Sequence, residues 1–112
     1  MELNEKDNNG YYPLLRAISK NNIDIVQLLI EYALQHQIIL KLNEKDNNGE
    51  FPLLWAISYN NIEIVQLLIE YANQYKIILE LNEKDKYGKY PLLLVIRNNN
   101  TEIAKLLLEY AK

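Results

Sequence analysis

The stretch GEFPLLWAISYNN, residues 49–61, decides the fold because two near-copies of it occur elsewhere in the chain. The counterparts are GYYPLLRAISKNN at residues 10–22 and GKYPLLLVIRNNN at residues 88–100. Each copy follows the pentapeptide LNEKD, which begins at Leu3, Leu42 and Leu81 and so recurs every 39 residues. The first two copies are identical at 30 of these 39 positions. A fixed period of this length is typical of proteins built from stacked repeats.

Each copy predicts two helices separated by turns. In the middle copy, NEKDNNG contains Asn, Asp and Gly, which suit a turn, and Pro52 then fits the first position of a helix of about two turns. Asn61 is suited to cap a second helix, and Glu63 lies near the positive end of its dipole. The second helix carries a broad apolar stripe: Ile64, Val65, Leu67, Leu68, Tyr71, Ala72 and Tyr75. Because such helices are not stable alone, neighbouring copies must stack, which predicts an all-α, helix-turn-helix repeat solenoid.

These residues resemble the ankyrin repeat, whose pattern runs D-x-x-G-x-T-P-L-H-x-A-A and then E-I-V-x-L-L-L. The first copy matches at Asp7, Gly10, Pro13, Leu14, Ala17, Ile18, Ile25, Val26, Leu28, Leu29 and, at the following turn, Asn43. The resemblance covers essentially the whole chain and implies one domain, residues 1–112, with repeats 3–41, 42–80 and 81–112. It also implies a non-catalytic module that binds proteins.

Two features depart from the ankyrin pattern. The Thr and His of T-P-L-H are replaced together by an aromatic residue and a leucine, with Tyr12, Phe51 and Tyr90 at the aromatic position. Removing both partners of a buried hydrogen bond is nearly neutral when apolar groups fill the space. The period is also six residues longer than the usual 33 or so. We expect the second helix to gain at least one turn and residues 38–42 to form an extended return to the next turn.

The third copy differs from the others as expected of an end repeat. Ile62, Val65 and Gln66 of the middle copy correspond to Thr101, Ala104 and Lys105, and DKYGK resembles the opening of C-terminal ankyrin caps. A terminal repeat must expose to water a surface that internal repeats bury. The first copy has no comparable cap, so we expect that self-association could occur through the N-terminal repeat.

The residues that differ between copies cluster on the first helix and the turn tip. By resemblance to ankyrin stacks, these positions form the face that contacts protein partners, and they include residue types enriched at interfaces. The predicted partner-binding residues are Tyr11, Arg16, Lys20, Glu50, Trp55, Tyr59, Lys89 and Leu94. Tyr87 in the third turn extends this set. The alternative is that exposed positions have simply drifted, because packing does not constrain them.

Composition excludes several other functions. The 112 residues carry a net charge of −3 and no basic cluster, so nucleic acid is not an expected partner. There is no cysteine and His36 is the sole histidine, so neither a metal nor another cofactor is predicted. Residues 1–10 are polar, and the most apolar stretch is interrupted by Gln, Glu and His, so we expect no secretory signal and no membrane helix. A cytoplasmic location is the default expectation.

Two hypotheses about function follow. The first is a non-catalytic protein-protein interaction module that binds through the first-helix and turn-tip positions. The alternative is a self-associating structural unit, because near-identical copies allow the end of one molecule to imitate the next repeat of another. The acid-Lys-acid triplets such as Glu44, Lys45 and Asp46 recur in every copy and are interpreted as scaffold. The near-identity of the copies is compatible with recent duplication and with an engineered or consensus-derived chain.

Overall fold

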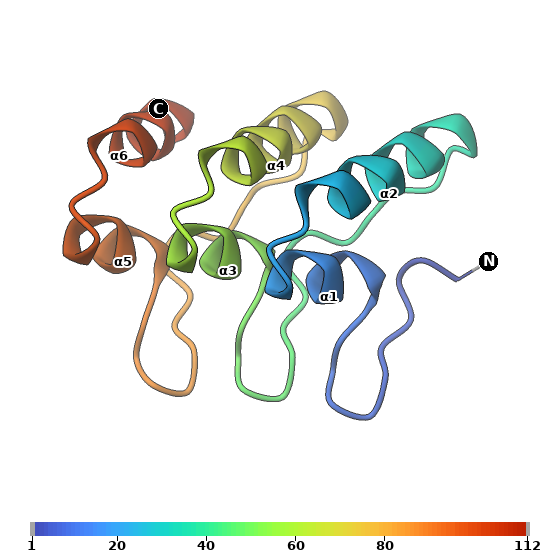
Figure 1. Ribbon diagram of the computed structural model, residues 1–112, viewed down its shortest axis with the longest axis horizontal. Coiled ribbons are helices and arrows are strands. Elements are labelled where there is room, and N and C mark those ends of the chain that lie inside the picture. Colours follow the sequence, from blue (N-terminus) through green and yellow to red (C-terminus); the bar gives the residue numbers. More distant parts are fainter. Residues whose placement is uncertain (1, 112) are drawn as a thin grey trace.

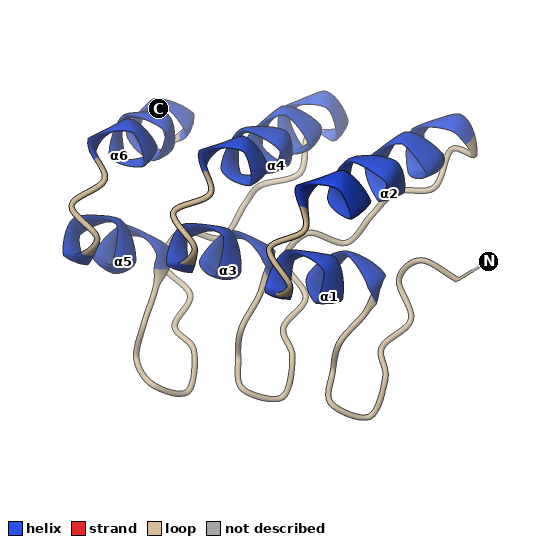
Figure 2. Ribbon diagram, in the orientation of Figure 1, coloured by secondary structure: helices blue, strands red, loops and turns tan. Residues whose placement is uncertain are grey.

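The computed structural model describes residues 2–111, which form six helices and contain no strand (Figures 1 and 2). The helices are α1 (Pro13–Ser19), α2 (Ile23–Gln35), α3 (Pro52–Ser58), α4 (Ile62–Tyr75), α5 (Pro91–Arg97) and α6 (Thr101–Tyr110). The short helices α1, α3 and α5 lie in one row and the longer helices α2, α4 and α6 in a second row (Figure 1). Three loops project side by side from the row of short helices. The predicted all-α repeat solenoid is confirmed.

The helix ends follow the predicted signals. Each short helix begins with proline at its first position. Each long helix is capped by asparagine, as at Asn61, whose Oδ1 accepts a hydrogen bond from the Ile64 N–H at 3.1 Å. The residue before each cap is also asparagine and has a positive φ, for example +54° at Asn60. Asparagine tolerates this left-handed conformation, so the chain can reverse between the two helices without glycine.

The extra residues of the 39-residue period lie at the end of the second helix and in a return segment. α2 and α4 contain 13 and 14 residues, close to four turns each. After α2, Gln37 takes a φ of +58° and reverses the chain, and residues 38–42 form neither helix nor strand. The Leu40 N–H of this return segment donates to the Tyr71 hydroxyl of the next repeat at 2.9 Å. The added residues therefore take part in contacts between repeats.

The core is continuous from one repeat to the next. Its members come from both rows of helices and from the segments between them, and the middle repeat contributes fully buried Leu54, Ile57 and Leu68. Two of the three aromatic residues that replace the ankyrin threonine also lie inside: Tyr12 and Phe51 are 2% and 1% exposed, whereas Tyr90 is half-buried. The Tyr12 hydroxyl donates to the Glu44 carbonyl oxygen at 2.9 Å, so its polar atom is satisfied by the next repeat. Within residues 2–111, no helix is both long and apolar enough to span a membrane.

Candidate functional site

The turn of each repeat is fixed by its aspartate. In the middle repeat, Asp46 Oδ1 accepts hydrogen bonds from the backbone N–H groups of Asn48 and Glu50 at 2.8 and 2.9 Å. The Asp46 N–H in turn donates to the Glu50 carbonyl oxygen at 2.8 Å. Gly49 closes the turn with a φ of +79°, a conformation that favours glycine. Because Asp7 and Asp85 make the same contacts, the side chain after the glycine has a defined position in every copy.

The turns of successive repeats are connected to one another. The Asn47 N–H donates to the Asn9 carbonyl oxygen at 3.0 Å, and the corresponding bond joins Lys86 to Asn48 at 3.0 Å. The acid-Lys-acid triplets add ion pairs between repeats: Lys6 with Glu44 at 3.2 Å and Lys45 with Glu83 at 3.4 Å. These contacts support the interpretation of the triplets as scaffold.

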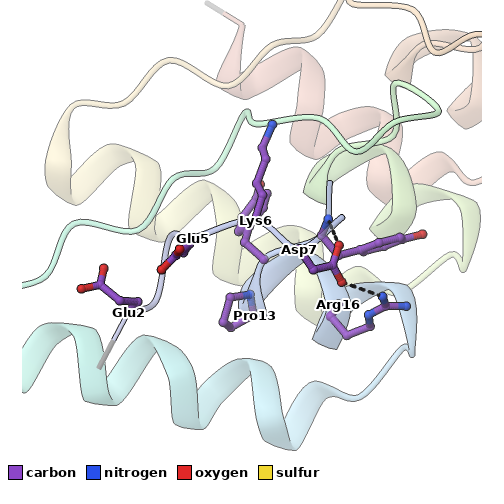
Figure 3. Close-up of a pocket in the computed structure, with 8 residues that line it drawn as sticks. Glu2, Glu5, Lys6, Asp7, Pro13 and Arg16 are labelled. Carbon is purple, nitrogen blue, oxygen red and sulfur yellow. Dashed lines mark hydrogen bonds and ion pairs between the residues drawn. The ribbon is translucent and has the colours of Figure 1, made fainter. Parts of the chain in front are cut away.

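Arg16 and Tyr11 form a paired group at the first repeat. The Arg16 guanidinium carbon lies 3.9 Å from the centre of the Tyr11 ring, within the range of a cation-π contact. The same guanidinium approaches Asp7 Oδ2 at 3.2 Å (Figure 3). The pKa of Asp7 is lowered, first because the Tyr11 N–H donates to it, and further because of the Asn9 N–H and Arg16. Asp7 thus remains ionised and orients an exposed arginine beside an aromatic ring.

Trp55 and Tyr59 form a stacked pair on α3. Their ring centres are 5.8 Å apart with an interplanar angle of 19°. The Tyr59 side chain is 42% exposed, and its hydroxyl donates to the Ser19 carbonyl oxygen at the end of α1. The buried indole Nε1 of Trp55 has no hydrogen-bond acceptor. A partly exposed tryptophan with an unpaired N–H is unusual, because buried donors normally find an acceptor.

Glu50 and Asp85 form a carboxyl pair between the second and third turns. Burial and then the neighbouring Asp85 carboxylate raise the pKa of Glu50 to about 8. For Asp85, burial raises the pKa, but this is outweighed by hydrogen bonds from Glu50 and from the N–H groups of Lys89 and Tyr87, so the pKa is lowered. Asp85 Oδ2 is buried and receives no bond from a fixed donor, and Lys89 Nζ lies 3.8 Å from it. The two carboxyl groups therefore hold one proton between them: burial and the negative charge of Asp85 raise the pKa of Glu50, whereas the pKa of Asp85 is lowered.

Two family models match the chain. One, described as ankyrin repeats (3 copies), matches residues 1–78, and a second, described as ankyrin repeat, matches residues 87–112. The chain belongs to the ankyrin repeat family. Ankyrin repeats are in general protein-protein interaction modules and are typically non-catalytic. No curated protein matches the chain.

The ankyrin stack buries two of the predicted partner-binding residues. Glu50 is 7% exposed because its side chain lies against the third turn, and Leu94 is 7% exposed on α5, which packs beside α3. The prediction that these two positions are available at the surface is therefore wrong. Leucine is shorter than the tryptophan at the equivalent position 55, so it does not extend past its neighbours.

The ankyrin stack leaves the remaining predicted residues accessible in whole or in part. Arg16, Lys20 and Tyr59 are exposed, whereas Tyr11, Trp55 and Lys89 are half-buried. In the third turn Tyr87 is 65% exposed, with Lys86 and Lys89 Nζ at 5.3 and 5.6 Å from its ring centre. These residues lie on the short helices and turns, as predicted. Within residues 2–111, no three His, Asp or Glu side chains are grouped to hold a metal ion.

One function of the variable positions was missed from the sequence. The Asn98 Nδ2, at the position equivalent to Tyr59, donates to the Ile57 carbonyl oxygen at 3.0 Å. Both residues therefore bind the end of the preceding short helix, although their side chains differ. The sequence signal was that Lys20, Tyr59 and Asn98 all carry a hydrogen-bond donor. Variation in this ankyrin protein is thus constrained by contacts between repeats as well as by exposure.

Proposed function

We propose that this ankyrin domain binds a protein partner through its first-helix face, the surface formed by the short helices and the turn tips. The residues assigned to this face are Tyr11, Arg16, Lys20, Trp55, Tyr59, Tyr87 and Lys89. Glu50 and Leu94 are left out because they are buried. The proposal treats repeats 3–41, 42–80 and 81–112 as one domain that presents a single surface.

The observation that carries the proposal is the stacked Trp55–Tyr59 pair, in which Tyr59 is 42% exposed and Trp55 is half-buried. Stacking and the bond from Tyr59 to Ser19 hold both rings in place before binding, so little side-chain entropy remains to be lost. Tryptophan, tyrosine and arginine are the residue types most enriched among those that dominate interface energies.

The charge of the face favours an acidic partner segment. Arg16, Lys20, Lys86 and Lys89 all lie on the short helices or turns, and Glu50 is protonated near neutral pH because its pKa is about 8. Among the exposed acids of these turns, Asp7 pairs with Arg16, Glu44 with Lys6 and Glu83 with Lys45. Carboxylates on a partner would therefore meet cations beside aromatic rings, an arrangement that speeds association and selects partners.

The test is affinity capture followed by isothermal titration calorimetry with each captured protein, because this measurement does not depend on Trp55, the sole tryptophan. Trp55→Ala and Arg16→Glu should each weaken binding at least about tenfold, as expected for a residue that dominates an interface. Gln66→Ala, an exposed change on α4, is the matched control and should leave affinity unchanged. Circular dichroism would show that the exposed Arg16→Glu variant is folded. Unchanged affinity in both first-helix variants would refute the proposal.

A further inference from the structure

Identical side chains are buried inside the stack and exposed at its two ends. Ile25 on α2 is 46% exposed, whereas its counterparts Ile64 and Ile103 are completely buried against the preceding repeat. At the opposite end Ile96 is 66% exposed, whereas its counterparts Ile18 and Ile57 are completely buried against the following repeat. The two halves of the internal junction are therefore both present on the surface, at opposite ends of one molecule (Figure 1).

The charges at the two ends are complementary. Each internal junction pairs the lysine of one triplet with the first glutamate of the next, as in Lys6–Glu44 and Lys45–Glu83. By the same pattern, Lys84 of the third repeat would pair with a glutamate of a following repeat, and Glu5 of the first repeat would pair with a lysine of a preceding repeat. Both are exposed, and neither forms an ion pair with any other residue from 2 to 111. Figure 3 shows Glu5 at the outer edge of the first repeat, while Lys6 points away from it toward the second.

Polar contacts of the junction also have unused counterparts at the ends. Asn61 Nδ2 donates to Asn21 Oδ1 at 2.8 Å, and Asn100 Nδ2 donates to Asn60 Oδ1 at 3.2 Å. The same series would join Asn22 of one molecule to Asn99 of another. At the turns of the internal junction, the buried side chain of Asp85 lies against Glu50 of the preceding repeat. The equivalent residue of the first repeat, Asp7, is half-exposed. In a second copy, the residue equivalent to Glu50 is Lys89, which carries the charge opposite to that of Asp7.

We propose that a second copy of this chain docks head to tail on the first repeat. The head face comprises Glu5, Asp7, Asn22, Ile25 and Leu28, and the tail face of the second copy comprises Lys84, Lys89, Ile96 and Asn99. Leu28 on α2 is 62% exposed, whereas its counterparts Leu67 and Leu106 in the other two repeats are half-buried. The contact repeats the packing that already joins one repeat to the next. Because the two faces differ, each bound copy presents a new head or tail, and the assembly grows as an open chain.

The contact is weaker than the internal junction. Two separate molecules lose translational and rotational freedom when they make the contact, a cost that repeats joined in one chain do not have. Assembly is therefore reversible on dilution, and added salt weakens it by screening the exposed ion pairs.

The test is the mass in solution measured by light scattering over about a hundredfold range of concentration. The chain should rise above its monomer mass of 13.2 kDa as concentration increases. Leu28→Glu blocks the head face, and Ile96→Glu blocks the tail face. Both residues are exposed, so neither change should unfold the monomer. Ile78→Glu is the matched control, since Ile78 is 78% exposed but belongs to neither face.

A mixture of the two blocked variants tests whether the contact joins the head of one molecule to the tail of another. Each blocked variant alone should stay monomeric, because one of its two faces is missing. An equal mixture should form a dimer that grows no further, because the intact tail of Leu28→Glu binds the intact head of Ile96→Glu. The Ile78→Glu control should assemble like the unmodified chain. A constant monomer mass of the unmodified chain, or a mixture in which no dimer forms, would overturn the proposal.

Discussion

The middle repeat and the outer repeats have nearly the same sequence but different surroundings. Ile64 in the middle repeat is completely buried, and Ile25, at the same position of the first repeat, is 46% exposed. Asp46 is buried, whereas Asp7 in an equivalent turn is half-exposed and binds Arg16. Whether a residue is buried in this protein therefore depends on whether a neighbouring repeat packs against it. The same residue should therefore contribute a different free energy in different copies.

The largest difference should come from truncating the apolar residue at the junction. Ile64→Ala should lower the free energy of unfolding by about 2–5 kcal/mol, because it removes buried methyl groups and leaves a cavity. Ile25→Ala should cost less than about 1 kcal/mol, because nearly half of the side chain is already in water. Urea unfolding of both variants measures the difference. Equal losses would contradict the dependence on neighbours.

The turn glycines should give the next largest contrast. All have a positive φ, but a Cβ on Gly10 would lie 2.8 Å from the backbone of Asp46 and Asn47, whereas a Cβ on Gly88 would meet no atom within 4 Å. Gly88→Ala should cost about 1–2 kcal/mol from the left-handed backbone alone. Gly10→Ala should cost roughly 1 kcal/mol more, because the second turn must also shift. Thermal unfolding of the two variants, with Gly49→Ala between them, tests this order.

The junction between the second and third turns should depend on pH. The pKa of Glu50 rises from 4.5 in the unfolded chain to about 8 in the folded protein, where Asp85, Asp46 and Lys89 are its charged neighbours. Between these values the folded protein binds more protons than the unfolded chain. The stabilisation that the Glu50 carboxyl group contributes is therefore complete below pH 4.5 and is lost as the pH rises through 8.

The expected loss is about 1–2 kcal/mol, less than full linkage gives, because the surroundings of the carboxyl group are partly hydrated. Glu50→Gln should remove this loss, since an amide donates to Asp85 at any pH. The measurement is the urea unfolding free energy as a function of pH. The exposed Glu70→Gln change is the control and should retain the dependence of the unmodified protein. A profile that Glu50→Gln leaves unaltered would contradict the carboxyl pair.

The smallest effect should appear at the helix caps. Asn61→Asp keeps the oxygen that caps α4 but removes the amide that donates to Asn21, so it should cost about 0.5–1 kcal/mol. Asn22→Asp should be neutral or slightly stabilising, because aspartate caps as well as asparagine and Asn22 Nδ2 makes no bond to the described residues. Thermal melts of both variants at one pH suffice. A loss at Asn22 as large as that at Asn61 would count against the contrast.

Local signals were sufficient to predict the elements of this fold. Pro52, Asn61 and the Asp46–Gly49 turn act within a few residues of themselves, so their effects could be assigned before the structure was known. The length of the second helix follows from the apolar stripe, which in the middle repeat runs on to Tyr75, where α4 ends. The candidate site was predicted less completely. Glu50 and Leu94 differ between copies, which predicts a surface position, but both are buried in the stack.

The sequence alone determined the repeat, its period, its helices and the ankyrin family, because these depend on spacing and on short-range backbone preferences. Only the tertiary structure decided which of three equivalent residues is buried and which carboxyl group holds a proton. Residues 39 positions apart are brought together by stacking, and their contacts depend on what the adjacent repeat offers. Glu50 is an ordinary surface residue by type, and it becomes a buried acid because Asp85 of the next turn lies beside it.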